Sequence, residues 1–456
     1  MGQGLSSDEL ALHSLERRAV EAVNWGMPAV NYDLMLRAMI ESVKGRANQI
    51  VYWSRLPDWK IQTLTPNPDV IYLMPFFNTR DAGPMVLEIP PADDGSINGT
   101  VMDAWQAALE DVGPAGVDMG NGGKYLILPP GYTGRTPQGY IVLPSMTYQG
   151  YALLRSVLES GSDTDVARAV AYGKRIELYP LSQAGQAPAT TFVDAIDVVY
   201  DATIPYDVRF FRALDRIVQA EPWLTRDKVM IDMLKSIGIE KGKRFRPDAK
   251  TQAILNAAAR EAHAWLDARY ELGFPYFYED RQWAFPGSPE LARTMGVFYE
   301  TPEVYSIDAR GLADYCAYST VKHLGAGQFY LMTVRDGAGG ALDGAGNYRL
   351  TVPAHAPVKQ HWSAVVYDRA THALIRDMSR ASRSSQSPGL QRNGDGSVDI
   401  HFGPKPPPSR ESNWIPTVAS GRFEVLFRLY GPEKSFFDKR WQLPDLEREV
   451  PGAPLD

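Results

Sequence analysis

The sequence predicts an α+β fold that is mainly β, with two antiparallel β-domains joined by a helical region. Short apolar runs bounded by Pro and Gly dominate two stretches of the chain, and helical periodicity dominates the stretch between them. This β, α, β order has no βαβ alternation, which favours antiparallel sandwiches or barrels over a parallel sheet. We divide the chain into N-terminal helices at 1–45, a first β-domain at 46–185, a helical connection at 186–325 and a C-terminal β-sandwich at 326–456.

The N-terminal stretch predicts two helices. Apolar residues recur at helical spacing after Ser7 and Asp8, which can cap the first turn. The Gly-Met-Pro sequence at 26–28 is expected to break this helix, because proline lacks an N–H and clashes with the preceding turn. A second helix is expected from Tyr32 to Val43.

Turn residues and apolar periodicity then predict the remaining elements. Strands of the first β-domain are expected at Met85–Ile89, Tyr125–Leu128 and Tyr140–Leu143. Helices of the middle region are expected at Val208–Ala220, from the cap Asp248 to Gly273, and near Ala309–His323. Strands of the C-terminal sandwich are expected at Gln328–Arg335, Tyr348–Val352, Trp362–Tyr367, Val398–Phe402 and Phe423–Tyr430.

Composition excludes several classes of protein. The 456 residues carry 47 basic and 54 acidic side chains of scattered sign, without the basic stripe of a nucleic-acid-binding protein. The single cysteine, Cys316, excludes an internal disulfide, thiolate zinc clusters and iron–sulfur sites. No apolar run approaches the ~20 residues that span a bilayer, and the N-terminus shows no secretory signal pattern.

Familiar reaction signatures are absent from the sequence. It contains no G-x-S-x-G elbow, no H-E-x-x-H and no G-x-G-x-x-G after a strand. The seven histidines never pair at the short spacings of a metal site, so neither a metal nor a cofactor is expected. His361, next to Trp362 on an expected strand, is interpreted as a packing residue.

The densest group of polar residues in apolar surroundings lies at Thr65–Tyr72. Pro66 and Pro68 push the residues before them out of the α region, so the segment is extended or turned. An extended segment places Asn67 and Asp69 on one face, where partial desolvation would raise the pKa of a carboxyl group. The alternative is a turn in which both side chains bind backbone N–H groups.

A second acidic residue, Asp103, is a candidate partner for Asp69. Two carboxyl groups in different surroundings can divide the work of general acid and general base. In this hypothesis Asp69, Asp103 and Tyr72 are the catalytic residues, and Lys124 helps Tyr72 to polarise the substrate. The alternative is that these acidic residues cap turns.

Substrate binding is assigned to a further set of residues. Three arginines among hydroxyl residues can hold an anionic group through forked hydrogen bonds, although a solvated loop has the same composition. The candidate substrate-binding residues are Asn67, Trp105, Lys124, Arg376, Arg380 and Arg383.

Motifs in fixed order resemble a known pair of domains and together cover about residues 30–440. Asn67-Pro68-Asp69, Asp103-Ala104-Trp105-Gln106 and Tyr179-Pro180-Leu181 resemble the domain of unknown function 1254. Asp343-Gly344, Trp362-Ser363, Asn413-Trp414-Ile415-Pro416 and Leu429-Tyr430 resemble the partner domain 1214. The family pattern T-P-N-x-D-T-x-Y maps to Thr65, Pro66, Asn67, Asp69 and Tyr72, with Val70 in place of the second Thr.

The resemblance implies jelly-roll-like and sandwich-like β-domains bridged by helices, in a bacterial protein that forms a homo-oligomer. It implies periplasmic or exported localisation if a leader was removed, and cytoplasmic localisation otherwise. No catalytic residues follow from it. Our leading hypothesis is a cofactor-free hydrolase of a small organic, ester, amide or glycosidic substrate. The alternatives are a ligand-binding or oligomeric assembly module with jelly-roll interfaces, and a metal-dependent hydrolase.

Overall fold

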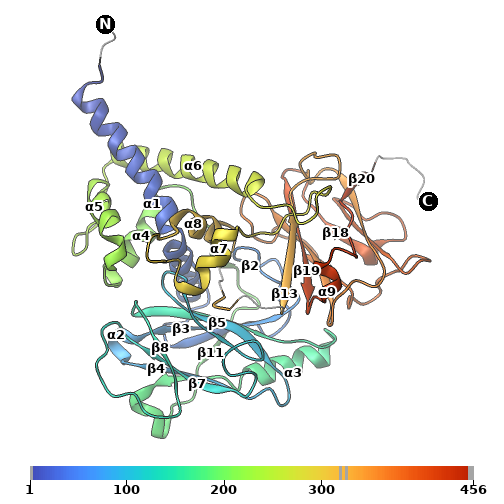
Figure 1. Ribbon diagram of the computed structural model, residues 1–456, viewed down its shortest axis with the longest axis horizontal. Helices are drawn as coiled ribbons and strands as arrows, with labels where there is room; N and C mark the ends of the chain where they lie inside the picture. The colour runs from blue at the N-terminus through green and yellow to red at the C-terminus, as the bar shows by residue number, and fades with distance from the viewer. Residues whose placement is uncertain (1–3, 318–320, 324–326, 450–456) are drawn as a thin grey trace.

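The computed structural model describes residues 4–317, 321–323 and 327–449. About 30% of the chain is helical and 25% is in strands, so the predicted α+β, mainly β class is confirmed. Two β-sandwiches and a group of helices form the molecule (Figure 1). The helices cover one face of the N-terminal sandwich, and the C-terminal sandwich lies at the side of both (Figure 1).

Two stacked sheets build the N-terminal sandwich. The larger sheet has the order β11-β1-β3-β9-β5-β6, and the smaller has the order β10-β4-β7-β8. The larger sheet consists of β1 (Gln49–Tyr52), β3 (Ile71–Asn78), β5 (Ile97–Asp103), β6 (Ala108–Val112), β9 (Gln149–Ser156) and β11 (Phe192–Asp194). The smaller consists of β4 (Met85–Ile89), β7 (Gly123–Leu128), β8 (Ile141–Pro144) and β10 (Glu177–Pro180), and a separate pair joins β2 (Ile61–Gln62) to β12 (Tyr200–Asp201).

The larger sheet is buried on both faces. On β3, the alternate residues Ile71, Leu73 and Phe77 pack with the smaller sheet, while Tyr72 and Phe76 pack with the helices. This strand therefore reads as a continuous apolar run, and the Tyr72 side chain faces away from the interior of the N-terminal sandwich.

Helices from the N-terminal part and from the middle of the sequence form one layer. The layer consists of α1 (Ser7–Arg37) with a π-helical extension (Ala38–Ser42), α4 (Val208–Ala220), α5 (Lys228–Ser236), α6 (Ala249–Leu272), α7 (Pro289–Thr294) and α8 (Ile307–Cys316). Smaller helices are α2 (Thr79–Ala82), α3 (Asp163–Gly173) and α9 (Lys434–Phe437). Short 3₁₀ turns lie at Leu181–Gln186, Thr225–Asp227, Met295–Val297 and Glu411–Asn413. Asn24 on α1 donates to Asp308 on α8 at 2.8 Å, which fastens the first helix to one of the last.

The predicted break at 26–28 is wrong, because α1 runs through it. Pro28 lies inside the helix, and every residue from Asn24 to Asp33 is buried. Gly26 serves packing, since a Cβ at this position would lie 3.0 Å from Leu214 on α4. Burial on all sides offsets the roughly 3 kcal/mol that an internal proline costs a helix.

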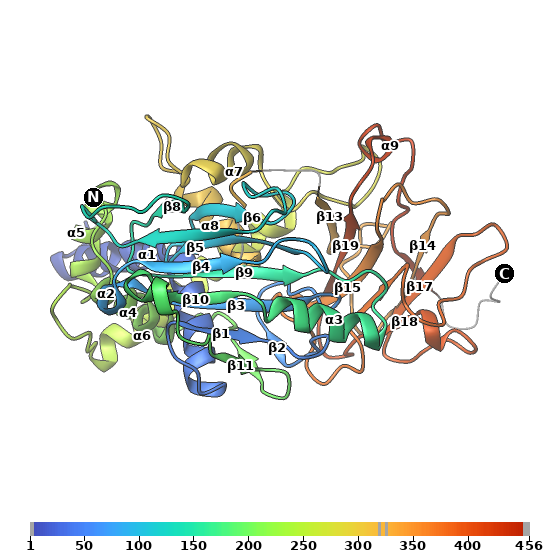
Figure 2. The same ribbon diagram turned by 90° about the horizontal axis from the view of Figure 1, so that it is seen from below.

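Two four-stranded sheets form the C-terminal sandwich, in the orders β13-β19-β15-β16 and β18-β17-β14-β20. Their strands are β13 (Gln328–Thr333), β14 (Asn347–Val352), β15 (Trp362–Asp368), β16 (Ser382–Ser384), β17 (Val398–Gly403), β18 (Trp414–Pro416), β19 (Phe423–Tyr430) and β20 (Glu447–Glu449). In Figure 2 the strands of the N-terminal sheets run toward this sandwich, and β13, β15 and β19 stand across their ends.

Several expected elements agree closely with the structure, and others differ from it in their bounds. The predicted segments Met85–Ile89, Val208–Ala220 and Phe423–Tyr430 have the same bounds as β4, α4 and β19. The helix expected to reach His323 ends at Cys316, because Ala317 is extended and its carbonyl accepts from Asn31 at 3.1 Å. Residues 318–320 of that expected helix lie outside the described residues. The sheets are mainly antiparallel, and short parallel pairs join β1 to β11, β7 to β8 and β17 to β18.

Candidate functional site

Residues 65–70, which we call the seam segment, lead from β2 into β3 and lie against the C-terminal sandwich. The Thr65 carbonyl accepts a hydrogen bond from Arg428 at 2.8 Å. The Pro66 carbonyl accepts one from the Tyr367 hydroxyl at 2.7 Å. Because both donors belong to the C-terminal sheet, these bonds hold the two sandwiches together.

Thr65 holds a strained backbone conformation at the start of this segment. Its φ angle is +39°, in the region that β-branched residues rarely adopt. Its N–H donates to the His372 carbonyl at 2.6 Å, and its hydroxyl donates to the Cys316 carbonyl at 3.0 Å. Such strain costs about 1–3 kcal/mol and persists only where the surroundings hold it in place.

The sheet face that receives the seam segment is polar. Ser363 and Tyr367 of β15 and His361, which directly precedes this strand, alternate onto this face, which we call the seam face. Ser363 pairs with Arg428 of β19, whose side chain lies on the same face together with that of Tyr430. Polar alternate positions normally face water on one side of an antiparallel sheet, but here they are buried.

The carboxyl group of Asp69 is buried against the seam face. Its Oδ1 accepts a hydrogen bond from the Ser382 hydroxyl at 2.6 Å. Burial raises its pKa, and the Ser382 bond and the nearby charges of His361 and Arg428 lower it by less. The Ser363 hydroxyl lies near the Asp69 carboxyl group and also lowers its pKa, although the distance and angle between the two groups do not meet the geometry of a hydrogen bond. The net result is a carboxyl group with a raised pKa, as a general acid or base requires.

Three buried polar atoms at this point have no hydrogen-bond partner among the described residues. They are Asp69 Oδ2, His361 Nδ1 and Ser363 Oγ. A buried polar atom without a partner costs about 1–3 kcal/mol, and such atoms are rare in native proteins. Their presence around one carboxyl group indicates a position where a water molecule or a ligand supplies the missing partners.

His361 has a defined orientation at the seam. Its ring stacks on that of Tyr430, with the ring centres 4.1 Å apart and the planes 19° apart. Burial lowers the pKa of His361, and the negative charge of Asp69 opposes this shift. The interpretation of His361 as a packing residue is therefore incomplete, since its imidazole also belongs to the polar cluster.

Asn67 and Tyr72 shape the seam segment. The Asn67 Oδ1 accepts from the Asp69 N–H at 3.0 Å, which is the turn considered as an alternative from the sequence. The Asn67 Nδ2 donates to the Tyr430 hydroxyl at 2.5 Å. The Tyr72 hydroxyl accepts from the Asn67 N–H at 2.9 Å. This turn brings the Asp69 carboxyl group to the C-terminal sheet.

Arg428 is the buried cation of the seam face. It is 3% exposed, and it donates to the Tyr367 hydroxyl at 2.5 Å in addition to the Thr65 carbonyl. Its guanidinium lies 5.0 Å from the centre of the Tyr330 ring. Among the described residues it forms no ion pair with a carboxylate, and its Nε has no hydrogen-bond partner. A buried cation of this kind attracts an anion or a developing negative charge.

A buried acid–imidazole pair continues the seam face beyond Arg428. His372 Nδ1 lies 2.9 Å from the Glu424 carboxylate, and both side chains are almost fully buried. The rings of Tyr270 and Tyr315 flank His372, each with its centre 4.6 Å away. The pair lies beside the strained Thr65, whose N–H binds the His372 carbonyl.

The structure does not bring Asp103 to Asp69. Opposite β9, Asp103 pairs with Gly150, whereas Ile71 pairs with Ser156. At about 3.3 Å per residue, this separation along the strand is roughly 20 Å, far beyond the ~9.5 Å of paired catalytic carboxyl groups. The proposed carboxylate pair is therefore not formed.

Asp103 instead closes the turn between β5 and β6. Its Oδ1 accepts from the N–H groups of Trp105 and Ala107 at 2.8 and 2.9 Å. Burial raises its pKa, and it also raises that of Asp314 on α8. The Trp105 ring packs on Trp25 with the ring centres 4.7 Å apart, so its position is that of a packing residue.

None of the other predicted substrate-binding residues forms a hydrogen bond or an ion pair with Asp69 among the described residues, although Arg383 follows Ser382 in the chain. Lys124 is on the smaller N-terminal sheet, where its ammonium group lies 3.3 Å from the Glu88 carboxylate. Arg376 forms an ion pair with Asp201 at 2.6 Å. The remaining two arginines have separate main-chain partners, Arg380 on the Glu411 carbonyl and Arg383 on the Ser382 carbonyl. The three arginines therefore do not converge on one anion.

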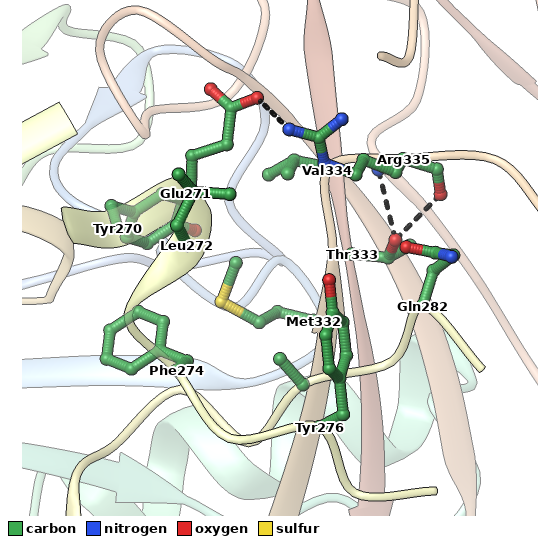
Figure 3. A pocket seen from close by; sticks show the side chains of 11 residues that line it. Tyr270, Glu271, Leu272, Phe274, Tyr276, Gln282, Met332, Thr333, Val334 and Arg335 are labelled. Atoms are coloured by element: carbon green, nitrogen blue, oxygen red, sulfur yellow. Dashed lines mark hydrogen bonds and ion pairs between the residues drawn. The ribbon is translucent and has the colours of Figure 1, made fainter. Parts of the chain in front are cut away.

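A small cavity lies at the end of α6, outside the seam (Figure 3). Its volume is about 20 Å³, which is enough for a water molecule. Glu271 and Arg335 form an ion pair of 2.7 Å at its edge, as the dashed line in Figure 3 shows. Such a cavity is too small for an organic substrate.

The sequence interpretation missed Ser363, Ser382, Arg428 and Tyr430. A signal was present, because β15 and β19 carry polar side chains at alternate positions, which normally indicates a solvent-facing surface. No group of three His, Cys, Asp or Glu side chains in a metal-binding arrangement occurs within residues 4–317, 321–323 and 327–449. In the same residues, no helix is long and apolar enough to cross a membrane.

Two family models match the chain. Residues 47–180 match a protein of unknown function (DUF1254), and residues 327–434 match a protein of unknown function (DUF1214). The chain carries a DUF1254 domain followed by a DUF1214 domain. The candidate site draws on both, since Asp69 belongs to the DUF1254 domain and His361, Ser363, Ser382 and Arg428 belong to the DUF1214 domain.

One solved structure shares the fold of this DUF1254–DUF1214 chain, and a second is similar to a smaller extent. The VPA0106 protein from Vibrio parahaemolyticus is 16% identical, with a TM-score of 0.57 over 95% of this chain and 100% of that one. An uncharacterised protein from Burkholderia cenocepacia is 11% identical, with a TM-score of 0.42 over 96% of this chain and 94% of that one. No curated protein matches the chain.

Proposed function

We propose that this protein is a hydrolase that cleaves a small ester or amide at the seam, with Asp69 as the general base and acid. The observation that carries the proposal is the buried Asp69 carboxyl group, one oxygen of which has no partner among the described residues and lies near a buried cation. Glycosidic substrates are less well supported, because their hydrolysis usually needs two carboxyl groups close together.

The side chains at the seam supply the parts that acyl transfer needs. The Asp69 carboxylate takes a proton from a water molecule, whose oxygen bonds to the carbonyl carbon as the carbonyl electron pair moves onto its oxygen. The Arg428 Nε–H, which has no partner among the described residues, can donate a hydrogen bond to that oxyanion, and the Ser363 hydroxyl can turn from Asp69 to donate a second one. When the tetrahedral intermediate collapses, the bond to the leaving group breaks and Asp69 returns its proton to that group.

The strain at Thr65 supports a seam that opens. Asp69 and Ser382 are only partly buried as residues, so the cluster reaches the molecular surface beside them. The strain at Thr65 is released when the segment moves. This release offsets part of the free energy that opening of the seam costs. In this proposal a small movement of the seam segment admits the substrate to the Asp69 carboxyl group.

The test measures hydrolysis of p-nitrophenyl acetate, p-nitrophenyl butyrate and a p-nitroanilide. We expect Asp69→Asn to lower the rate by about a hundredfold or more, since general acid–base groups contribute that much. Asp336→Asn is the matched control, because Asp336 is also buried but binds the N–H groups of its own turn. Equal rates in the two variants, or a wild-type rate no higher than that of an unrelated protein, would contradict the proposal.

A second candidate is a non-enzymatic binding or assembly module in which the seam only fastens two domains. The observation that favours it is that Thr65 and Pro66 bind the C-terminal sheet through their main-chain carbonyls. In that case Asp69→Asn changes the free energy of unfolding or the oligomeric state and no hydrolytic rate. Thermal unfolding and light scattering of the same variants separate the two functions.

A further inference from the structure

A second cavity opens at one end of the C-terminal sandwich, on the other side of β15 from the seam face. Its volume is about 260 Å³. It lies where β14 ends at Val352 and where β15 and β17 begin, at Trp362 and Val398. Trp362 points away from the seam, because its neighbour Ser363 lies on the seam face. The cavity is therefore separate from the proposed catalytic cluster.

The accessible lining of this cavity is mostly polar, but three buried apolar side chains form its inner wall. Val352, Trp362 and Val398 are buried there, and the Trp362 ring stacks on Phe427 with the ring centres 5.5 Å apart. The main-chain N–H of Trp362 donates to the Ser385 hydroxyl at 3.3 Å. This leaves the hydroxyl proton of Ser385 available for another acceptor.

The rim of the cavity carries the cationic side chain of an arginine and the ionisable side chain of a histidine. Arg392 and His355 both line it and both are exposed. Among the described residues, Arg392 forms no ion pair and no hydrogen bond through its guanidinium. The nearest acidic group along the chain, Asp395, is occupied by the N–H and the hydroxyl of Ser397 in its own turn. The fork of an unpartnered arginine is suited to bind a carboxylate through two hydrogen bonds.

We propose that this cavity binds a small organic carboxylate, with the apolar part of the ligand against Trp362 and the carboxylate on Arg392. Ser385 and His355 add a hydroxyl and an imidazole within the same cavity. Its volume lies just below the roughly 300–1,000 Å³ of typical ligand sites, which limits the ligand to about one ring or a short chain. The inference is independent of the proposed hydrolase, since no residue is shared.

The experiment uses 4-fluorobenzoate as the probe and follows its ¹⁹F NMR line width as the full-length protein is added. 4-Fluorobenzyl alcohol, which has the same ring and no charge, is the ligand control. Arg392→Gln removes the cation, Arg392→Lys keeps the charge without the fork, and Arg246→Gln removes an exposed arginine of the helical region.

We expect wild-type protein, Arg246→Gln and Asp69→Asn to bind 4-fluorobenzoate equally. Arg392→Gln should weaken binding by about tenfold or more, and Arg392→Lys by less, because a charge-assisted bidentate pair is lost in the first and only its geometry in the second. Added salt should weaken binding, since both rim groups are exposed. Equal affinity in Arg392→Gln, equally tight binding of the alcohol, or no binding at millimolar probe would overturn the proposal.

Discussion

Removal of one hydroxyl group should loosen the seam without changing its packing. Tyr367→Phe keeps the ring and removes an oxygen that donates to the Pro66 carbonyl and accepts from Arg428. The substitution leaves no cavity, but two buried polar groups lose a partner. At about 1–3 kcal/mol for each stranded group, the closed seam should lose roughly 2–6 kcal/mol relative to an open one.

Hydrogen–deuterium exchange measures this change directly, because it reports local opening separately from global unfolding. The Thr65 N–H, which binds the His372 carbonyl, should exchange at least about 30-fold faster in Tyr367→Phe, since 1.4 kcal/mol corresponds to a factor of ten. Peptides that cover residues 61–73 carry the signal.

Tyr348→Phe provides the matched control. The Tyr348 hydroxyl accepts from the Asp343 N–H at 3.0 Å, within the C-terminal sandwich. This variant should leave exchange in residues 61–73 unchanged. If Tyr367→Phe exchanges there no faster than Tyr348→Phe, the seam bonds do not hold the two sandwiches together, and the reasoning is refuted.

Three further predictions concern charge and backbone. Burial raises the pKa of Asp69, so its contribution to the free energy of unfolding is fully present below the ordinary carboxyl pKa of ~3.9 and is lost as the pH rises through the raised value. The melting temperature of wild-type protein minus that of Asp69→Asn should therefore fall between pH 4 and neutrality, and a rise would show that the polar contacts outweigh burial. Gly113→Ala should destabilise the protein far more than Gly83→Ala in urea unfolding. Both glycines have positive φ, but a Cβ at Gly113 would lie 1.8 Å from a carbonyl oxygen, whereas a Cβ at Gly83 would meet open space. Similar losses of stability in the two variants would contradict this prediction. Arg376→Ala should cost about 1 kcal/mol or less in the same assay and leave ester hydrolysis unchanged, since its pair with Asp201 is exposed; a larger loss would mean that the pair belongs to a wider network.

Local patterns predicted most of the elements, because they depend on neighbouring residues. The observed ends of the strand Met85–Ile89 and of the helix Val208–Ala220 coincide with turn or capping residues in the sequence. The helix break at 26–28 was predicted wrongly, since no local pattern reveals that α1 is surrounded by other helices. Tertiary burial there outweighs the intrinsic cost of proline.

Only part of the candidate site could be predicted from the sequence. The prolines around Asn67 do place Asp69 in a turn and in apolar surroundings. Its partner Ser382 lies 313 residues further along the chain, a distance that no spacing argument can bridge. The alternate polar residues on β15 and β19 are typical of a solvent-exposed face. The sequence of a strand does not reveal which other segment covers that face.

The position of α1 has a consequence for how the protein is made. This helix leaves the ribosome before the sandwich that it covers, yet Asn24 binds Asp308, 284 residues later, and Asn31 binds the carbonyl of Ala317. Because domains generally fold as their sequence emerges, the N-terminal sandwich must form while its covering helix still lacks these neighbours. We expect nascent chains that stop before α8 to expose apolar surface and to depend on chaperones until synthesis has passed that point.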